Sequence, residues 1–210
     1  MGNNFTRLKF VVKKEIKERL KEFAENRKRE DKIFEELCFC ILTPQSKAKN
    51  CWHSIESLKK KGLLLSGKEE EIKKELKNVR FKNKKAKYLI EARNFFLKNG
   101  RLAIKSLIDS FNSPFELREY LVKNIKGLGY KEASHFLRNI GFGDNIAILD
   151  RHILRNLKRL SVIREIPKSL SKKKYLEIEK RFIEFSKKIN IKPSELDLIL
   201  WAKETGFIFK

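Results

Sequence analysis

The chain has 210 residues, enough for one large or two small domains, and 41% of them are hydrophobic, including sixteen Phe. A folded core is therefore expected. Lys and Arg outnumber Asp and Glu by 50 to 27, which gives a formal net charge of +23. This excess predicts a polyanionic partner. No apolar run approaches the roughly 20 residues of a membrane-spanning helix, and no secretory signal is visible, so we expect no association with a membrane.

The three cysteines, Cys38, Cys40 and Cys51, are too few and wrongly spaced for a disulfide framework or a four-cysteine zinc or iron–sulfur site. We therefore expect buried thiols, no metal site and a reducing cytoplasm. Abundant Lys, Ile and Glu beside a single Met and a single Gln are typical of a heat-adapted, archaeal-type cell.

Helical periodicity and capping signals predict an all-α chain without paired strands. The first helix, about 12–29, carries Ile16, Leu20 and Phe23 on one apolar face. Asp31 is expected to cap the second helix and Ser46 the third. The later helices are expected, in chain order, at about 33–42, 47–58, 69–77, 84–99, 102–110, 114–124, 130–140, 151–160, 170–189 and 193–203.

The glycines of Ile125-Lys126-Gly127-Leu128-Gly129 lie between two of these helices. Gly127 and Gly129 allow a sharp turn whose backbone N–H groups can approach a phosphate, next to the positive end of the following helix. Lys123 and Lys126 add charge. The hairpin therefore predicts DNA binding that does not depend on base sequence. The alternative is an ordinary corner between helices that uses glycine only for its geometry.

Lys131 and Asp150 are separated by 150 − 131 = 19 residues, about one helix and one loop. Lys131 lies in the first turn after the hairpin, where the helix dipole and neighbouring cations disfavour an ammonium, so a nucleophilic neutral amine becomes accessible. Asp150 stands at an N-cap position, where backbone N–H groups keep a carboxylate ionised. That carboxylate can stabilise the positive charge of a breaking glycosidic bond. Taken singly, Lys131 could only contact phosphate and Asp150 could only cap its helix.

GLGYK followed by LDRH resembles the signature of the helix-hairpin-helix DNA glycosylase superfamily. The resemblance implies that Lys131 is the nucleophile of a bifunctional enzyme, that Asp150 is the catalytic carboxylate, and that His152 contacts a DNA phosphate. ILTPQSKAKN is similar to an early segment in which Gln45 would fill the gap left by a flipped nucleotide. Because no cysteine follows Cys51, the chain departs from the endonuclease III-like branch.

The segment WAKETGFIFK resembles the small archaeal 8-oxoguanine DNA glycosylases, the type-two group. This resemblance implies that Lys210 reaches the flipped base and helps to distinguish 8-oxoguanine from guanine. Trp201 is a candidate for stacking on the base, with core packing as its alternative. His135, one helical turn from Lys131, is a candidate for the pocket lining, with packing as an equal alternative. For Lys210 the alternative is a frayed chain end.

The sequence therefore predicts two helical domains, 31–141 and 1–30 with 142–210, with the active site in the cleft between them. The expected activity is excision of 8-oxoguanine through a lysine Schiff base, followed by β-elimination. The expected partner is double-stranded DNA containing 8-oxoguanine or abasic sites, bound by a monomer that requires no cofactor. Two alternatives remain open: a glycosylase for an oxidised pyrimidine or alkylated purine, and a non-catalytic DNA-binding protein.

Overall fold

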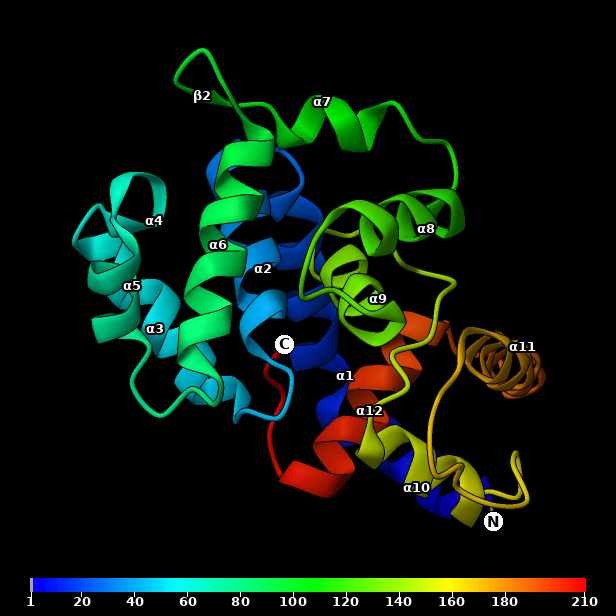
Figure 1. Cartoon of the computed structure of the whole chain (residues 1–210). Coiled ribbons are helices and arrows are strands. Elements are labelled where there is room, and N and C mark those ends of the chain that lie inside the picture. Colours follow the sequence, from blue (N-terminus) through cyan, green and yellow to red (C-terminus); the bar gives the residue numbers. More distant parts are fainter. Residues whose placement is uncertain (1) are drawn as a thin grey trace. The chain divides into compact units, whose positions relative to one another are not determined.

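The computed structural model describes residues 2–210, with the side chains of residues 14–210, and it is almost entirely helical (Figure 1). In chain order the elements are α1 Gly2–Asn26, α2 Glu30–Leu42, α3 Ala48–Lys60, α4 Leu63–Ser66, α5 Glu69–Glu75, α6 Lys82–Phe96, β1 Leu97–Lys98, β2 Arg101–Leu102, α7 Ile104–Asp109, α8 Pro114–Asn124, α9 Tyr130–Asn139, α10 Arg151–Arg159, α11 Lys172–Lys188 and α12 Pro193–Thr205. The all-α prediction is confirmed. Within residues 2–210, no helix combines the length and the apolar character needed to span a membrane.

The chain folds into two compact units. The central unit is Asn26–Phe136, and the terminal unit combines the chain up to Glu25 with Leu137–Lys210. The boundary between Phe136 and Leu137 falls inside α9, so one helix carries residues of both units. Lys131 belongs to the central unit and Asp150 to the terminal unit.

The core of the central unit is built around α2, which contacts α3, α6 and α7. Residues 33–42 of this helix are all buried, as its nearly continuous apolar sequence requires. The predicted burial of Cys38, Cys40 and Cys51 is confirmed. Burial raises the pKa of Cys51 to about 11, so this thiol stays protonated and unreactive at neutral pH.

In the terminal unit α12 packs against α10 and α11, and α1 contributes the buried side chains of Ile16 and Phe23. Phe23 also supports the buried guanidinium of Arg138, which lies 4.9 Å from the ring centroid. The end of α9 approaches α1 closely at Gly141, where an added Cβ would lie 2.6 Å from the Cα of Ala24. Glycine at 141, with φ +66°, is therefore needed for both its space and its backbone conformation.

The expected absence of paired strands is wrong at one point. The helix expected to continue to Gly100 ends at Phe96, and a short antiparallel hairpin pairs Lys98 with Arg101. The two residues at its tip, Asn99 and Gly100, have φ values of +50° and +75°. A two-residue turn of this kind needs positive φ at both positions, which Asn-Gly adopts readily.

Two expected helix caps are also wrong. Asp31 lies inside α2, whose N-cap is Arg29, and its carboxylate instead pairs with the Arg29 guanidinium at 2.7 Å. Ser46 precedes the N-cap of α3, which is Lys47. The Ser46 hydroxyl is used in a contact with α6, a partner distant in sequence that capping patterns do not indicate.

Candidate active site

The glycine hairpin joins the end of α8 to the start of α9 in the conformation that its sequence predicts. Gly127 has a φ of +89°, and an added Cβ would lie 2.8 Å from the ring of Tyr88. Ile125 closes α8 by donating its N–H to Leu121, and Leu128 donates back to Ile125. Gly129 is exposed, so this part of the backbone is open to a ligand.

A buried arginine fixes the two helices of the hairpin against each other. The guanidinium of Arg118, 1% exposed, donates to the Ser134 hydroxyl at 3.0 Å. It also lies 5.3 Å from the ring centroid of Tyr130 and 5.5 Å from that of Phe115, distances that favour cation–π attraction. Tyr130 donates its hydroxyl to Glu119 at 2.6 Å. The first turn of α9, which carries Lys131, is therefore held at a fixed place beside α8.

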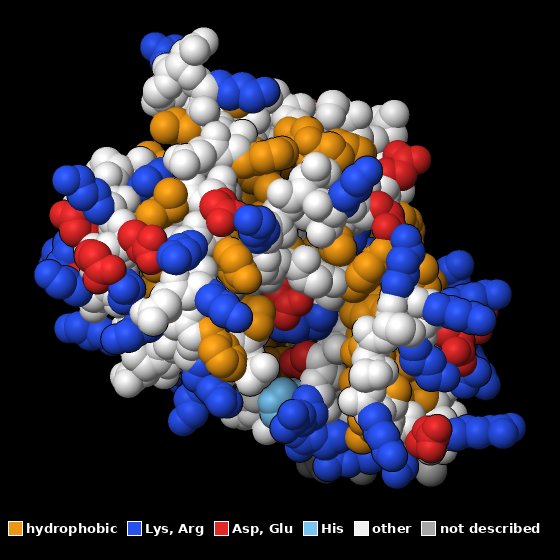
Figure 2. Space-filling model, viewed as in Figure 1, with side chains coloured by type: hydrophobic (Ala, Val, Ile, Leu, Met, Phe, Trp, Pro, Cys, Tyr) orange, Lys and Arg blue, Asp and Glu red, His pale blue; other side chains and the backbone are white. Residues whose placement is uncertain are grey.

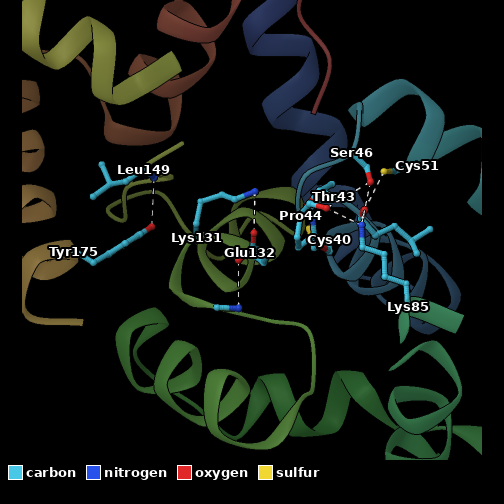
Figure 3. A network of polar contacts seen from close by, with 12 residues as sticks. Cys40, Thr43, Pro44, Ser46, Cys51, Lys85, Lys131, Glu132, Leu149 and Tyr175 are labelled. Carbon is cyan, nitrogen blue, oxygen red and sulfur yellow. Dashed lines mark hydrogen bonds and ion pairs between the residues drawn. The ribbon is translucent and has the colours of Figure 1, made fainter. Parts of the chain in front are cut away.

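Lys131 occupies the first turn of α9, as expected, with 26% of its side chain exposed. Its Nζ lies 3.0 Å from an oxygen of Glu132, and Figure 3 shows the two side chains joined there. The sequence argument considered only the helix dipole and neighbouring cations, so it missed this carboxylate. The signal was present: a Glu at the third helical position commonly reaches back to the N-cap N–H. Here the other carboxylate oxygen of Glu132 accepts a hydrogen bond from the Gly129 N–H at 3.3 Å.

Gln45 is exposed on the loop after α2, with a φ of +55° in the left-handed region. The loop is held by the ammonium of Lys85 on α6, which donates to the carbonyls of Leu42 and Pro44 at 2.7 Å each and to the Ser46 hydroxyl at 3.0 Å. Figure 3 shows these contacts converging on the Lys85 nitrogen. A left-handed non-glycine residue costs on the order of 1 kcal/mol, and such a conformation persists when its surroundings hold it.

Burial lowers the pKa of Lys85 below its ordinary value, although its ammonium is held by three oxygen acceptors. We predict that Lys85→Met lowers the free energy of unfolding by roughly 2–3 kcal/mol, because a buried and a partly buried carbonyl lose a charged donor. Limited proteolysis should then cut the Gln45 loop faster, and urea denaturation should give the stability change. Lys87→Met, on the exposed face of the same helix, is the matched control. Unchanged stability and unchanged cleavage would contradict this role for Lys85.

A pocket of about 290 Å³ lies in the central unit beside the hairpin. It brings Gly127 of the hairpin together with Pro44 of the Gln45 loop, two segments that the sequence singled out separately. Aromatic rings and lysine side chains form much of its wall. Its lining residues are Ile41, Pro44, Phe81, Lys84, Lys85, Tyr88 and Gly127.

Asp150 is the N-cap of α10, as predicted, and its carboxylate accepts the Ile153 N–H at 2.8 Å. The buried segment before it is fastened by α11. Tyr175 donates its hydroxyl to the Ala147 carbonyl at 2.6 Å and accepts the Leu149 N–H at 3.4 Å, the latter contact shown in Figure 3. Glu179 accepts the Ala147 N–H at 2.9 Å. Sequence reasoning missed both side chains, which fix where Asp150 begins its helix.

If Asp150 is the catalytic carboxylate, as the sequence predicts, Tyr175→Phe should lower the excision rate between about 10- and 100-fold, because a displacement near 1 Å at such a group can cost that much. Single-turnover kinetics on saturating substrate would measure it, with DNA affinity determined in parallel. Tyr120→Phe, on α8 with its ring packed on Phe111, is the control for loss of a tyrosine hydroxyl. An unchanged single-turnover rate would show that Asp150 is positioned without this hydroxyl.

His152 lies two residues after Asp150, and its Nδ1 is 3.9 Å from a carboxylate oxygen of Glu204 on α12. Glu204 also accepts a hydrogen bond from Asn156 at 3.1 Å and pairs with Arg159. Glu204 was not singled out from the sequence, since nothing local connects it with α10.

Aromatic side chains anchor the segment after α12. Gly206 ends α12 with a φ of +81°. The rings of Trp201 and Phe207 meet edge to face with 5.1 Å between their centroids. The rings of Phe207 and Phe209 are in contact with 6.4 Å between their centroids. Trp201 and Lys210 are each partly exposed. This stack fixes the path of the chain toward Lys210.

His135 is 7% exposed and meets Phe39 edge to face at 5.5 Å between ring centroids. These contacts favour the packing alternative for this histidine. Among residues 2–210, no group of three or more His, Cys, Asp or Glu is placed to hold a metal ion.

Basic side chains are numerous on the surface, and Figure 2 shows Lys and Arg outnumbering acidic side chains on the face in view. The exposed lysines of the hairpin region are Lys123 and Lys126, of which Lys126 pairs with Glu91 at 3.0 Å. Two exposed lysines therefore lie at the hairpin, and such basic side chains are expected at a nucleic-acid interface.

The chain matches the family model described as 8-oxoguanine DNA glycosylase over residues 16–191. A protein named 8-oxoguanine DNA glycosylase/AP lyase from Fusobacterium nucleatum is 55% identical, covering 93% of this chain and 91% of its own. The crystal structure of the Methanocaldococcus jannaschii 8-oxoguanine glycosylase/lyase in complex with a 15mer DNA containing 8-oxoguanine matches with a TM-score of 0.89 and 43% identity, covering 99% and 98% of the two chains. The Thermotoga maritima 8-oxoguanine DNA glycosylase structure gives a TM-score of 0.87 at 34% identity, covering 99% and 97%. These relatives come from bacteria as well as archaea, and the chain belongs to the 8-oxoguanine DNA glycosylase family.

Proposed function

We propose that this chain excises 8-oxoguanine from double-stranded DNA and then cuts the strand by β-elimination. One observation carries the proposal. In this chain, which belongs to the family, the hairpin places Lys131 in the first turn of α9, and Asp150 caps α10. The named relatives, one of them solved with DNA containing 8-oxoguanine, support the choice of substrate.

In the proposed reaction the exposed hairpin backbone binds a phosphate of the damaged strand. The target nucleotide is flipped out, because its glycosidic bond is inaccessible inside the base stack. Gln45 fills the gap in the duplex, and His152 contacts a phosphate near the lesion.

The neutral amine of Lys131 attacks C1′ of the deoxyribose. The bond from C1′ to the base breaks, and its electron pair leaves with the base, which takes up a proton. The ionised carboxylate of Asp150 stabilises the positive charge that develops on the sugar during this step.

Opening of the sugar ring then gives an imine between Lys131 and C1′. Loss of a C2′ proton and cleavage of the bond from C3′ to oxygen release the downstream strand with its 5′ phosphate, and water hydrolyses the imine to restore the amine. We propose that a monomer performs these steps, and they require no redox cofactor or metal.

A panel of duplexes, each with one lesion, tests the substrate. We expect the highest excision rate on 8-oxoguanine compared with oxidised pyrimidines, alkylated purines and undamaged guanine. A clear preference for another lesion would contradict 8-oxoguanine as the substrate and would identify that lesion instead. DNA binding without any excision would favour the non-catalytic alternative.

Lys210 is proposed to contact the flipped base, next to the aromatic anchors of Trp201 and Phe207. We predict that Lys210→Ala reduces discrimination between 8-oxoguanine and guanine by roughly 10- to 100-fold, the value of a hydrogen bond from a charged group. The affinity for duplex with an abasic site should change much less, because no base is present to contact. Excision rates and dissociation constants measure the two effects, with Lys203→Ala, a substitution of an exposed residue of α12, as the control. Equal losses on all substrates would contradict base recognition by Lys210.

A further inference from the structure

Glu132 has two contacts that bear on the proposed chemistry. One carboxylate oxygen accepts the Gly129 N–H at 3.3 Å, and the other lies 3.0 Å from the Nζ of Lys131. The Glu132 side chain is 13% exposed, so this carboxylate sits against the protein and is not a freely solvated charge. Figure 3 shows it beside the Lys131 amine, with a second contact to the backbone.

The Gly129 amide is a phosphate donor in the proposed function. In the free protein it is already bound by an anion, the Glu132 carboxylate. A DNA phosphate that takes this N–H must come within a few ångströms of that carboxylate, where two like charges repel. The phosphate and Glu132 therefore compete for one donor.

The same carboxylate affects the nucleophile. Its oxygen lies at ion-pair distance from the Lys131 Nζ, whereas attack on C1′ needs a nitrogen whose lone pair is free to reach the sugar. Two other titratable groups interact electrostatically with Lys131: Lys85 on α6 and Cys51 on α3. Lys85 is a second cation that interacts with both Lys131 and Glu132.

Both contacts are made by one carboxylate group, so they are broken together. We propose that Glu132 is a positioning residue that links DNA docking to activation of Lys131. In the free protein it occupies the Gly129 amide and neutralises the Lys131 ammonium. A DNA phosphate at the hairpin displaces it, and the same movement removes the counter-ion of the nucleophile. This inference rests on the proposed roles of the hairpin and Lys131.

Glu132→Gln is the decisive variant, because an amide oxygen can still accept the Gly129 N–H while the charge is gone. Dissociation constants should be measured on duplex with a tetrahydrofuran abasic analogue, which cannot form a Schiff base. We expect Glu132→Gln to bind about fivefold more tightly than wild type, since one repulsion near a phosphate is removed. Glu132→Asp keeps the charge and should bind less tightly than Glu132→Gln. Glu70→Gln removes an exposed carboxylate on α5 and controls for net charge.

Kinetics on duplex containing 8-oxoguanine distinguish displacement of Glu132 by phosphate from an ion pair between Glu132 and Lys131 that persists in the DNA complex. If phosphate displaces Glu132, then Glu132→Gln lowers KM by the same factor as the dissociation constant, and kcat changes far less. A permanent partner of Lys131 would instead shift kcat and its pH profile at saturating DNA. Either that shift or an affinity equal to wild type would overturn the proposal. Thermal melting checks that the variants are folded.

The outcomes also separate this inference from the proposed function. If wild type forms no borohydride-trapped complex with abasic DNA, the role of Lys131 as nucleophile fails, and the affinity comparison still tests the competition at Gly129. If wild type is trapped and Glu132→Gln binds no more tightly, the competition fails and the nucleophile stands.

Discussion

Lys131→Gln is expected to abolish the covalent complex that borohydride traps with abasic or 8-oxoguanine DNA, because an amide cannot form an imine. Removal of a covalent nucleophile typically costs at least about a thousandfold in rate, so strand cleavage at the lesion should fall by that factor or more. Gel analysis of trapped complexes and of nicked strands measures both effects. DNA binding should persist, since the substitution leaves the hairpin backbone untouched.

Lys123→Gln is the matched control, because it removes one exposed positive charge from the same motif. It should weaken DNA binding in a salt-dependent way while leaving trapping detectable. Trapping that persists in Lys131→Gln would mean that another amine is the nucleophile. Lys85 would then be the next residue to test, because its amine interacts electrostatically with that of Lys131.

Asp150→Asn is expected to slow base excision by about 100- to 1,000-fold, the usual cost of losing one electrostatic stabiliser of a charged transition state. The fold should be preserved, because Asn and Asp are about equally good N-cap residues and an Asn oxygen can still accept the Ile153 N–H. Single-turnover excision gives the rate, and a duplex with an abasic analogue gives the affinity. The affinity should stay within about threefold of wild type, since loss of an acidic group does not remove a phosphate contact.

Asp144→Asn provides the comparison for Asp150→Asn. Asp144 lies in the same connection between α9 and α10 and accepts contacts from Lys192 and Ser194. Its substitution should lower stability slightly and leave excision near the wild-type rate. If both variants lose activity in proportion to their stability, Asp150 acts only as a cap, which is the alternative the sequence left open.

Features set by a few neighbouring residues were predicted well. The Asp150 cap and the turn at Gly127 each depend on hydrogen bonds or φ values within a few residues. The hairpin at Asn99-Gly100 shows that even a local signal can be misassigned, because Gly is both a common helix terminator and a turn residue.

Contacts between distant segments were not predictable in the same way. Lys85 holds the carbonyl of Leu42 from 43 positions away, and Tyr175 holds that of Ala147 from 28. The sequence around a helical lysine or tyrosine does not indicate which distant residue it will contact. A buried acceptor needs a hydrogen-bond partner from the protein, and which acceptors are buried depends on how the core packs.

The amino-acid sequence by itself determined the helical class, the turn at the glycine hairpin, and the identity of Lys131 and Asp150 as candidate reactive groups. These follow from periodicity, glycine geometry and the chemistry of single side chains, which act over one or two helical turns. Only the tertiary structure decided which groups hold them: Arg118 at the hairpin, Lys85 at the Gln45 loop, and Tyr175 before Asp150. It also decided that Glu132 contacts the Gly129 amide and the Lys131 amine at once. The physical reason is that hydrogen bonds need atoms about 3 Å apart, and for distant residues only the packed fold supplies that proximity.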